Sequence, residues 1–407
     1  MTRKTKAERQ QPAERQQPAE RLTSLPPYPF ARWAAEVAAV QRRGVDVIRL
    51  DIGNPDLAPP AHVVETLCAS ASEATHHGYA SYRGLPFLRR AMSDYYARRF
   101  GVEIDPESEV VPLMGSKEGI VNLALAWLDP GDLVLVPDPG YAPYTMGARL
   151  AGAEVVTFPL PASRAFLPDF EAIPDHVASK AKMIWLNYPN NPTGAVADRA
   201  FLEEAVAFAR RHDLLLCYDA PYCDVTYQGY VAESVLQVAG AKEVAVEFNS
   251  LSKTLNMAGW RVGMAVGQAE ALSALAQVKS NVDSGMFHPL QEAAARALDI
   301  EPAWIDARNA IYQERLNLLV AGLTALGLEA SLPRAALYLW VPVPSGNDAE
   351  GLARHWLEHA GVAVAPGSFF GPSGEGYLRI SATAPTVRIE EAMARLRRLA
   401  APPPPGG

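Results

Sequence analysis

Cysteine is scarce in this sequence. The 407 residues include Cys68, Cys217 and Cys223, and no two of these form a C-x-x-C pair. An odd number of cysteines at irregular spacing argues against a disulfide framework and against a zinc site, so we expect no metal. No segment approaches the ~18 consecutive apolar residues of a membrane span, and the N-terminus shows no apolar stretch typical of a signal peptide. These absences predict a cytoplasmic protein with no membrane contact.

Basic residues are outnumbered by acidic ones. Lysine and arginine total 37, aspartate and glutamate total 45, and the formal net charge is −8. A general nucleic-acid binder presents a basic face, so this balance argues against nucleic acid as a partner. The first 30 residues are too short and too polar for a helix-turn-helix domain, which disfavours a DNA-binding regulator. No G-x-G-x-x-G motif follows an apolar run, which disfavours a nicotinamide-binding Rossmann enzyme.

Both ends of the chain differ from the middle. The motif AERQQP occurs twice between residues 7 and 18, and the chain ends in APPPPGG. Such polar, proline-containing segments have too little apolar surface to offset the entropy lost on ordering. We therefore predict a disordered tail over residues 1–24 and a second disordered end over residues 401–407.

Between these ends, short apolar runs alternate with helical patterns. The runs are DLVLVPD (132–138), AEVVTFPL (153–160), AKMIWLNYP (181–189), DLLLCYDAPY (213–222), KEVAVEFNS (242–250) and WRVGMAVG (260–267). Several of them lack polar–apolar alternation, which suits strands that are buried on both faces. Residues 198–212 instead show the apolar spacing of an amphipathic helix. This alternation predicts an α/β fold with a mostly parallel sheet covered by helices on both faces.

The pattern changes after about residue 288. A long helical stretch (301–326) precedes the apolar segments LYLWVPV (337–343), VAVAPGSFF (362–370) and YLRISAT (377–383). This order predicts a large domain over residues 61–290 and a smaller α+β domain over residues 291–400. We expect residues 25–60 to join the smaller domain, because the long helix can lead the chain back toward them.

Polar side chains gather at the expected carboxyl ends of the strands, where ligands bind in open α/β sheets. In chain order they are Asn191, Asp219, Tyr222, Ser250, Lys253 and Arg261. Each has a structural explanation by itself: the asparagine can serve a turn, the aspartate can cap a loop, the serine can cap a helix and the lysine can be solvated. We favour a shared functional site, because the set makes chemical sense together.

The set fits the chemistry of pyridoxal 5′-phosphate. The aldehyde of this cofactor needs an amine to form a Schiff base, and Lys253 in NSLSKTLNMAGWRVG supplies one. Its pyridine nitrogen must stay protonated to act as an electron sink, which requires a buried carboxylate such as Asp219. Its phenolic oxygen needs the donors that Asn191 and Tyr222 provide, and Tyr141 can stack on the ring face.

The phosphate of the same cofactor needs anion donors. Ser250 and Ser252 offer hydroxyl groups, and Arg261 offers a guanidinium. Ser116, in GSKEGI, lies at an expected helix N-terminus, where an anion is favoured. The neighbouring Lys117 is compatible with a phosphate contact and equally with a solvated side chain.

The motifs PNNPTG, DAPY, SLSKTLNMAGWRVG and YLRIS occur in this order. Together they resemble the fold-type I, class I/II aminotransferases over roughly residues 25–400. The resemblance implies the PLP-dependent transferase fold (type I), with a mostly parallel seven-stranded sheet in the large domain and a smaller α+β domain. It also implies the transfer of an amino group between an L-amino acid and a 2-oxo acid such as 2-oxoglutarate.

The same resemblance implies further residue roles. Lys253 would shuttle the substrate proton, and Asn191 would contact the substrate as well as the cofactor. Arg379, in GYLRISAT, matches the arginine that clamps the substrate carboxylate, and Gly53, in DIGNPD, matches backbone that lines the substrate site. Tyr79 matches the tyrosine that reaches the cofactor phosphate of the neighbouring subunit, which implies a homodimer with composite active sites.

A finer resemblance involves GSKEGI, SKTLNMAGWRVGMAVG, QVKSNVDSGMF and GEGYLRISATAPTVRIEEA. These segments are similar to bacterial and archaeal LL-diaminopimelate aminotransferase-type enzymes, which implies a role in lysine biosynthesis. Related enzymes act on alanine, aspartate, aromatic amino acids or N-succinyl-diaminopimelate, and a PLP-dependent lyase would share Lys253 and Asp219, so these alternatives stay open. Asn281 and Asp283 are candidates for reading the distal end of the substrate, but equally for serving a helix end.

Overall fold

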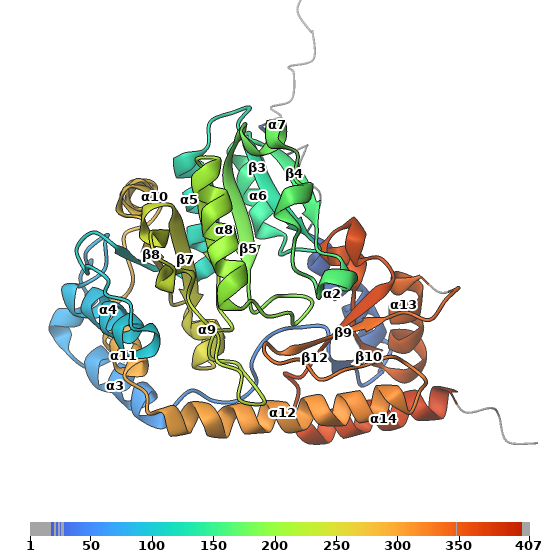
Figure 1. Ribbon diagram of the computed structural model, residues 1–407. Helices are drawn as coiled ribbons and strands as arrows, with labels where there is room; N and C mark the ends of the chain where they lie inside the picture. The colour runs from blue at the N-terminus through green and yellow to red at the C-terminus, as the bar shows by residue number, and fades with distance from the viewer. Residues whose placement is uncertain (1–17, 20–21, 23–24, 26–27, 347, 401–407) are drawn as a thin grey trace, which may run out of the picture.

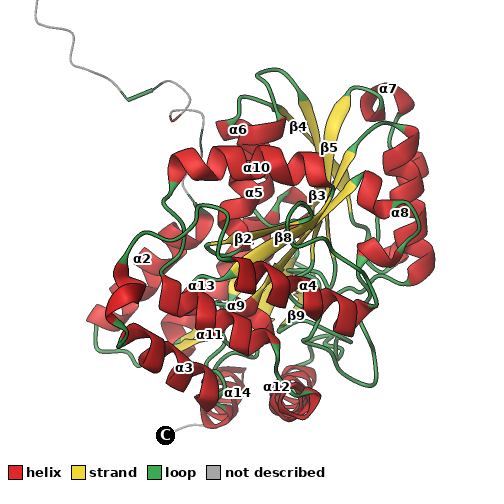
Figure 2. Cartoon of the chain, turned by 90° about the vertical axis from the view of Figure 1, so that its left-hand side faces the viewer, coloured by secondary structure: helices red, strands yellow, loops and turns green. Residues whose placement is uncertain are grey.

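A seven-stranded sheet lies at the centre of the larger part of the chain (Figures 1 and 2). Across the sheet the strands are β2 (Val110–Leu113), β8 (Gly263–Gly267), β7 (Ala245–Ser250), β6 (Leu215–Asp219), β5 (Ala181–Asn187), β3 (Leu133–Asp138) and β4 (Glu154–Pro159). β8 is antiparallel to both of its neighbours, and the other six strands run in one direction. The predicted mostly parallel, seven-stranded α/β fold is therefore confirmed.

The computed structural model describes residues 18–19, 22, 25, 28–346 and 348–400. Most of the tail predicted over residues 1–24, and all of the end predicted over residues 401–407, lie outside these residues. Within the described ranges, none of the helices combines the length and the hydropathy needed to cross a lipid bilayer.

Alternate residues of the central strands enter two apolar cores on opposite faces of the sheet. In β6, Leu215 and Cys217 pack in one core, and Leu216 and Tyr218 pack in the other. The first face is covered by α5 (Ser116–Trp127), α6 (Pro143–Leu150) and α10 (Ala269–Val282), and the second by α8 (Arg199–Arg211) and the short α7 (Asp175–Ala178) (Figure 2). Burial on both faces explains the unbroken apolar runs in the sequence.

A further group of helices extends the second core. It contains α3 (Ala61–Ala71) and α4 (Pro86–Phe100), both of which pack against α11 (His288–Leu298). Between α3 and α4, a 3-10 turn is fixed to α11 by stacking of the His76 and His288 rings, whose centroids are 3.8 Å apart. The predicted domain boundary at residue 290 falls inside α11, whose Ala293 and Ala297 pack in the core of the large sheet.

The smaller unit has its own apolar core. Its strands are β9 (Tyr338–Pro342), β11 (Ala365–Pro366) and β12 (Tyr377–Ser381), in the antiparallel order β11-β12-β9, and the parallel pair β1 (Ile48–Arg49) and β10 (Val362–Ala363). Its helices are α2 (Pro29–Arg42), α13 (Ala349–Ala360), α14 (Thr386–Ala400) and the C-terminal part of α12 (Pro302–Thr324), which runs beside α14 (Figure 1). We propose that the domain junction lies in α12, since Trp304 packs against the larger core and Leu316 belongs to the smaller one.

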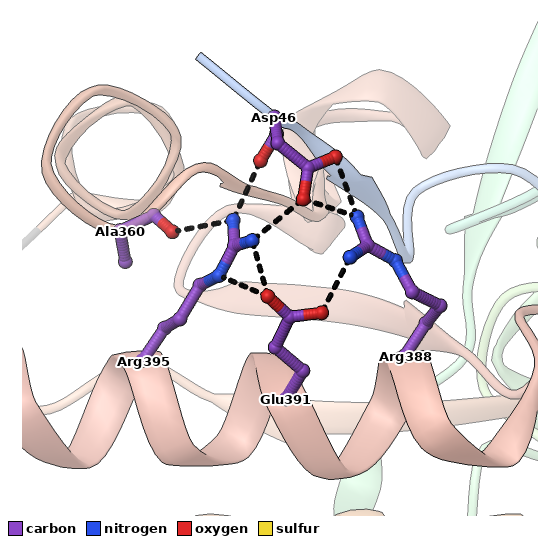
Figure 3. Close-up of polar contacts among 5 residues, drawn as sticks. All are labelled: Asp46, Ala360, Arg388, Glu391 and Arg395. Carbon is purple, nitrogen blue, oxygen red and sulfur yellow. Dashed lines mark hydrogen bonds and ion pairs between the residues drawn. The ribbon is translucent and has the colours of Figure 1, made fainter.

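Ion pairs fix the segment that leads into β1 onto α14 (Figure 3). The Asp46 carboxylate accepts hydrogen bonds from Arg388 and Arg395, each at 2.7 Å, and Glu391 bonds to both arginines. The two guanidinium groups hold the pKa of Asp46 below its ordinary value. Asp46 is 62 % exposed and the other three groups are partly exposed, so water and salt screen the attraction. The contacts therefore act mainly to set the position of the incoming chain.

The packing of α2 predicts that the N-terminal segment stabilises the smaller core. Trp33 is 1 % exposed and packs against Phe369, and its indole nitrogen has no hydrogen-bond partner within the described residues. Trp33→Ala should therefore lower the free energy of unfolding of the cofactor-free protein by about 3–5 kcal/mol, as expected for emptying a large buried site. The measurement is urea unfolding followed by far-UV circular dichroism.

Val387→Ala is the control, because Val387 is 67 % exposed on α14. It should change the unfolding free energy by less than about 0.5 kcal/mol. Equal urea midpoints for the two variants would show that α2 is not part of the cooperative core.

Candidate active site

A cavity of about 420 Å³ opens at the carboxyl edge of the central sheet. The adjacent strands β5, β6 and β7 end there in Asn187, Asp219 and Ser250. Twelve of the thirteen residues that the sequence predicted as site residues line the cavity. They are Gly53, Ser116, Lys117, Tyr141, Asn191, Asp219, Tyr222, Ser250, Ser252, Lys253, Arg261 and Arg379. Segments far apart in the sequence thus meet where ligands bind in open α/β sheets.

Lys253 lies on the single-turn helix α9 (Leu251–Thr254), directly after β7. Its Nζ donates a hydrogen bond to the Gly53 carbonyl, and its backbone carbonyl accepts one from Arg308 at 2.6 Å. Loss of hydration, followed by the positive charges of Arg379 and Arg261, lowers the pKa of Lys253 to about 7. Near neutral pH the amine is therefore substantially uncharged, the form that a nucleophile or general base requires.

Asp219 ends β6 and is 3 % exposed. Its Oδ2 accepts a hydrogen bond from Tyr144 at 2.6 Å, and its Oδ1 has no partner within the described part of the chain. Burial raises the pKa of Asp219 to about 7, and the Tyr144 hydroxyl partly opposes this rise. An unpartnered buried carboxylate oxygen on a cavity wall suits a cationic N–H, which is what a protonated pyridine ring offers.

One end of the cavity is built to hold an anion. α5 begins at Ser116, so its first backbone N–H groups and its dipole face this end. Gly115 precedes it at φ 81°, and a Cβ there would lie 2.0 Å from Nη2 of Arg261. The Arg261 guanidinium donates to the Ala258 carbonyl at 2.9 Å and lies 3.5 Å from the Ser252 hydroxyl. The donor set fits the phosphate of pyridoxal phosphate.

The cavity wall also carries Arg379, from β12. Its Nη1 donates to Asn191 Oδ1 at 2.8 Å, and its Nη2 donates to the Asp51 carbonyl at 2.6 Å. Its guanidinium lies over the Tyr338 ring at 4.3 Å from the centroid, over Phe370 at 4.8 Å and over Phe30 at 5.4 Å. These neighbours fix the guanidinium plane, which favours two-point binding of a carboxylate.

Three further cavity residues have partners within the chain. The Tyr222 hydroxyl lies 2.8 Å from that of Tyr338, and Tyr141 packs edge-on against Tyr144. Lys117 extends over the Tyr28 ring, with its Nζ 4.7 Å from the ring centroid. Its pKa is lowered by burial and then by Arg261. Lys117 is thus an exposed residue that lines the cavity and contacts Tyr28.

Tyr79 and the two candidates for distal recognition lie elsewhere. Tyr79 is 94 % exposed and does not line the cavity. The Asn281 amide donates to the Gln277 carbonyl at 2.8 Å, and Asp283 Oδ2 accepts from Lys279 at 2.6 Å. Within the chain, Asn281 and Asp283 therefore serve the end of α10.

The structure adds residues that the sequence did not suggest. Tyr144 bonds Asp219, and Asn187 donates to the Asp219 carbonyl at 2.6 Å while accepting from the Asn191 backbone at 2.8 Å. Tyr338 joins Tyr222 to Arg379. The sequence could have predicted Asn187 as a site residue, because it directly follows an apolar run and begins NYPNNPTG. No comparable pattern in the sequence singles out Tyr144 or Tyr338.

The cavity carries an excess of positive charge in an acidic chain. Its cationic residues are Arg49, Lys117, Lys253, Arg261 and Arg379, and its acidic residue is Asp219. Across the described ranges, Arg49 alone among these cations is paired with a carboxylate, that of Asp51 at 2.7 Å. Such a cavity attracts anions and suits a phosphate together with carboxylates. Fold and site together define a pyridoxal-phosphate enzyme of fold type I.

The chain belongs to the aminotransferase class I and II family, whose model matches residues 45–396. It is 50 % identical over 376 residues to the LL-diaminopimelate aminotransferase of Desulforudis audaxviator, covering 92 % of this chain and 96 % of that one. It is 49 % identical over 378 residues to the enzyme of the same name from Moorella thermoacetica, covering 93 % and 97 %. The chain is therefore a pyridoxal-phosphate-dependent aminotransferase.

Similarity to solved structures supports the assignment of the chain to this family. Substrate-bound BacF from Bacillus subtilis matches with a TM-score of 0.91 at 37 % identity, covering 95 % of this chain and 98 % of that one. A probable N-succinyldiaminopimelate aminotransferase from Thermus thermophilus matches with a TM-score of 0.85 at 38 % identity, covering 91 % and 99 %. The predicted PLP-dependent transferase fold is confirmed, and the roles of individual site residues stay predictions.

The environment of Lys253 predicts unusual reactivity in the cofactor-free protein. With a pKa of about 7, about three quarters of this amine is neutral at pH 7.5. Lys182 is the control, because its ion pair with Asp132 raises its pKa above the ordinary lysine value. Competitive acylation read by mass spectrometry should give a pH midpoint for Lys253 that lies several units below that of Lys182. Similar midpoints would contradict the environment described for Lys253.

Proposed function

We propose that this chain is an LL-diaminopimelate aminotransferase that passes an amino group to 2-oxoglutarate in lysine biosynthesis. The observation that carries the proposal is the set of cations around the cavity, most of which lack a carboxylate partner within the described residues. A phosphate on the cofactor and two carboxylates on the substrate match that charge. 2-Oxoglutarate, the proposed acceptor, is also a dicarboxylate.

The choice of diaminopimelate rests on two supports. The curated relatives that carry this activity in their names reach 44–50 % identity over more than nine-tenths of this chain. In addition, Lys117 lines the same cavity as Arg379 and lacks an acidic partner in the described part of the chain. We assign Arg379 to the carboxylate of the reacting amino-acid head and Lys117 to that of the distal head.

The residues of the cavity can divide the reaction among themselves. Bound pyridoxal phosphate supplies an electron sink for the substrate α-carbon. Lys253 would hold the cofactor aldehyde at rest, and its neutral amine would serve as the base that takes the substrate α-proton and returns a proton. Asp219 would keep a proton on the ring nitrogen, and Arg379 would orient the substrate through its carboxylate. Ser250, Ser252, Arg261 and the N-terminus of α5 would hold the phosphate.

A donor panel tests this function. With 2-oxoglutarate as acceptor, glutamate formation should show a kcat/KM for LL-diaminopimelate at least about tenfold above that for any other donor, a difference of about 1.4 kcal/mol in transition-state binding. The other donors are meso-diaminopimelate, N-succinyl-diaminopimelate, aspartate, alanine and aromatic amino acids. A higher value for one of these would replace the proposed substrate, and donor breakdown without any need for 2-oxoglutarate would indicate a lyase.

Lys117→Met refines the same test. Because Lys117 lies in the cavity without an acidic partner in the described residues, its loss should lower kcat/KM for LL-diaminopimelate by about 10- to 100-fold, the range expected for a hydrogen bond to a charged group. Alanine has no distal carboxylate and reports any indirect effect on the cofactor. An equal loss for both donors would assign Lys117 to the cofactor and not to the substrate.

We also propose a homodimer in which Tyr79 binds the cofactor phosphate of the partner subunit. Tyr79 is almost fully exposed and does not line the cavity of its own chain, while stacking of His76 on His288 fixes the turn just before it. A tyrosine held at the surface in this way suits a contact across a subunit interface. The cytoplasmic location expected from the sequence likewise stays a prediction.

Subunit exchange tests the composite site. Tyr79→Phe and Arg379→Ala should each impair turnover, with the larger loss for the arginine because its contact is charge-assisted. Mixed dimers would contain one site with both lesions and one intact site, so random pairing should restore about a quarter of wild-type activity. Tyr82→Phe, at a neighbouring exposed tyrosine, is the control and should stay active alone. If exchange is confirmed by mass and no activity returns, Tyr79 acts within its own subunit.

A further inference from the structure

Tyr338 links two parts of the site that serve different ligands. It begins β9, is 2 % exposed, and lies with its hydroxyl 2.8 Å from that of Tyr222. Its ring supports the guanidinium of Arg379 at 4.3 Å. A Cβ on Gly53 would lie 1.9 Å from the Tyr338 hydroxyl, so this oxygen is packed closely against backbone. Tyr338 thus has little freedom to move.

The direction of the hydrogen bond between the two tyrosines follows from counting protons. Each hydroxyl carries one proton. Within the described residues, each of these hydroxyls has the other as its hydrogen-bond partner. If Tyr222 gives its proton to the ring oxygen of the cofactor, the bond between the tyrosines must be donated by Tyr338. The order is then Tyr338 to Tyr222 to the cofactor oxygen.

We propose that Tyr338 is a positioning residue that donates a hydrogen bond to Tyr222 and thereby strengthens the bond from Tyr222 to the cofactor ring oxygen. The inference rests on the proposed role of Tyr222. Hydrogen bonds in a chain polarise and reinforce one another, by roughly 10–30 % per bond. Since its ring also supports Arg379, Tyr338 connects the residue that binds the substrate carboxylate with the residue that binds the ring oxygen.

The hydroxyl of Tyr338 should change the pKa of the Lys253–cofactor linkage in a definite direction. A donor on the ring oxygen stabilises negative charge there. That charge is least compensated once the nearby nitrogen of the Lys253–cofactor linkage has lost its proton, so the donor favours the deprotonated linkage. Removing the Tyr338 hydroxyl should therefore make the linkage keep its proton to a higher pH.

The substitution Tyr338→Phe removes the hydroxyl group alone and so tests its effect by itself. The ring that supports Arg379 remains, and so do the other titratable groups that face this tyrosine, Tyr28 and Tyr141. Tyr227→Phe is the matched control, because Tyr227 is also buried and donates to the Ala336 carbonyl at 2.8 Å, outside the cavity.

The experiment is a spectroscopic pH titration of the resting holoenzyme without substrate, which follows the absorption band of the Lys253–cofactor linkage. Tyr338→Phe should raise the midpoint by a few tenths of a pH unit, in line with the ~10–30 % reinforcement. Tyr222→Phe should raise it further, and the double variant should match Tyr222→Phe, because the effect of Tyr338 passes through Tyr222. Tyr227→Phe should leave the midpoint unchanged.

Three results would overturn the proposal. An unshifted or lowered midpoint in Tyr338→Phe, beside a raised one in Tyr222→Phe, rejects the relay and leaves the role of Tyr222 intact. A full additional shift in the double variant shows that Tyr338 acts independently of Tyr222. An unshifted midpoint in Tyr222→Phe removes the premise, whereas the aminotransferase activity is judged separately by the donor panel.

Discussion

This site depends on uncompensated positive charge. Among the described residues, four of the five cations that line the cavity have no carboxylate partner. Arg379 and Arg261 both repel the charged form of Lys253, and this repulsion adds to the loss of hydration in lowering its pKa. The folded chain therefore holds these groups in an arrangement that an anion would stabilise. A ligand stabilises the state of a protein to which it binds, so phosphate and carboxylate ligands should stabilise the folded protein.

The two apolar cores hold this arrangement from both sides. The larger core fixes the strand ends that carry Asp219 and Lys253, and the smaller core fixes the strands that carry Arg379 and Tyr338. The aromatic rings around Arg379 come from α2, from β9 and from the turn after β11. This arrangement of rings therefore exists only when the smaller unit has folded. With the proposed roles of Arg379 and Lys253, substrate binding would depend on the smaller core and proton transfer on the larger one.

The sequence predicted cavity residues correctly where a residue suited to the chemistry directly follows a predicted strand. Asp219 and Lys253 follow apolar runs directly, and the rule that ligands bind at carboxyl strand ends brought them together. It failed where contacts depend on distant segments. Tyr338 and Tyr144 look like ordinary core tyrosines in the sequence, and their hydroxyl partners lie 116 and 75 residues away. The domain boundary at residue 290 stays a prediction, and it falls inside α11, whose Ala293 and Ala297 pack in the larger core.

The same burial that protects the site leaves its two central ionisable groups close to neutrality before the cofactor binds. The pKa of Asp219 is raised to about 7 and that of Lys253 is lowered to about 7, so neither is firmly charged at neutral pH. A protonated ring nitrogen beside Oδ1 of Asp219 would restore the carboxylate, because an opposite charge within hydrogen-bond distance favours ionisation. Lys253 is already partly neutral at this pH, and the neutral amine is the form that can condense with the cofactor aldehyde. One cofactor would therefore use two groups that start alike in different ways, Asp219 as a fixed anion and Lys253 as a neutral nucleophile.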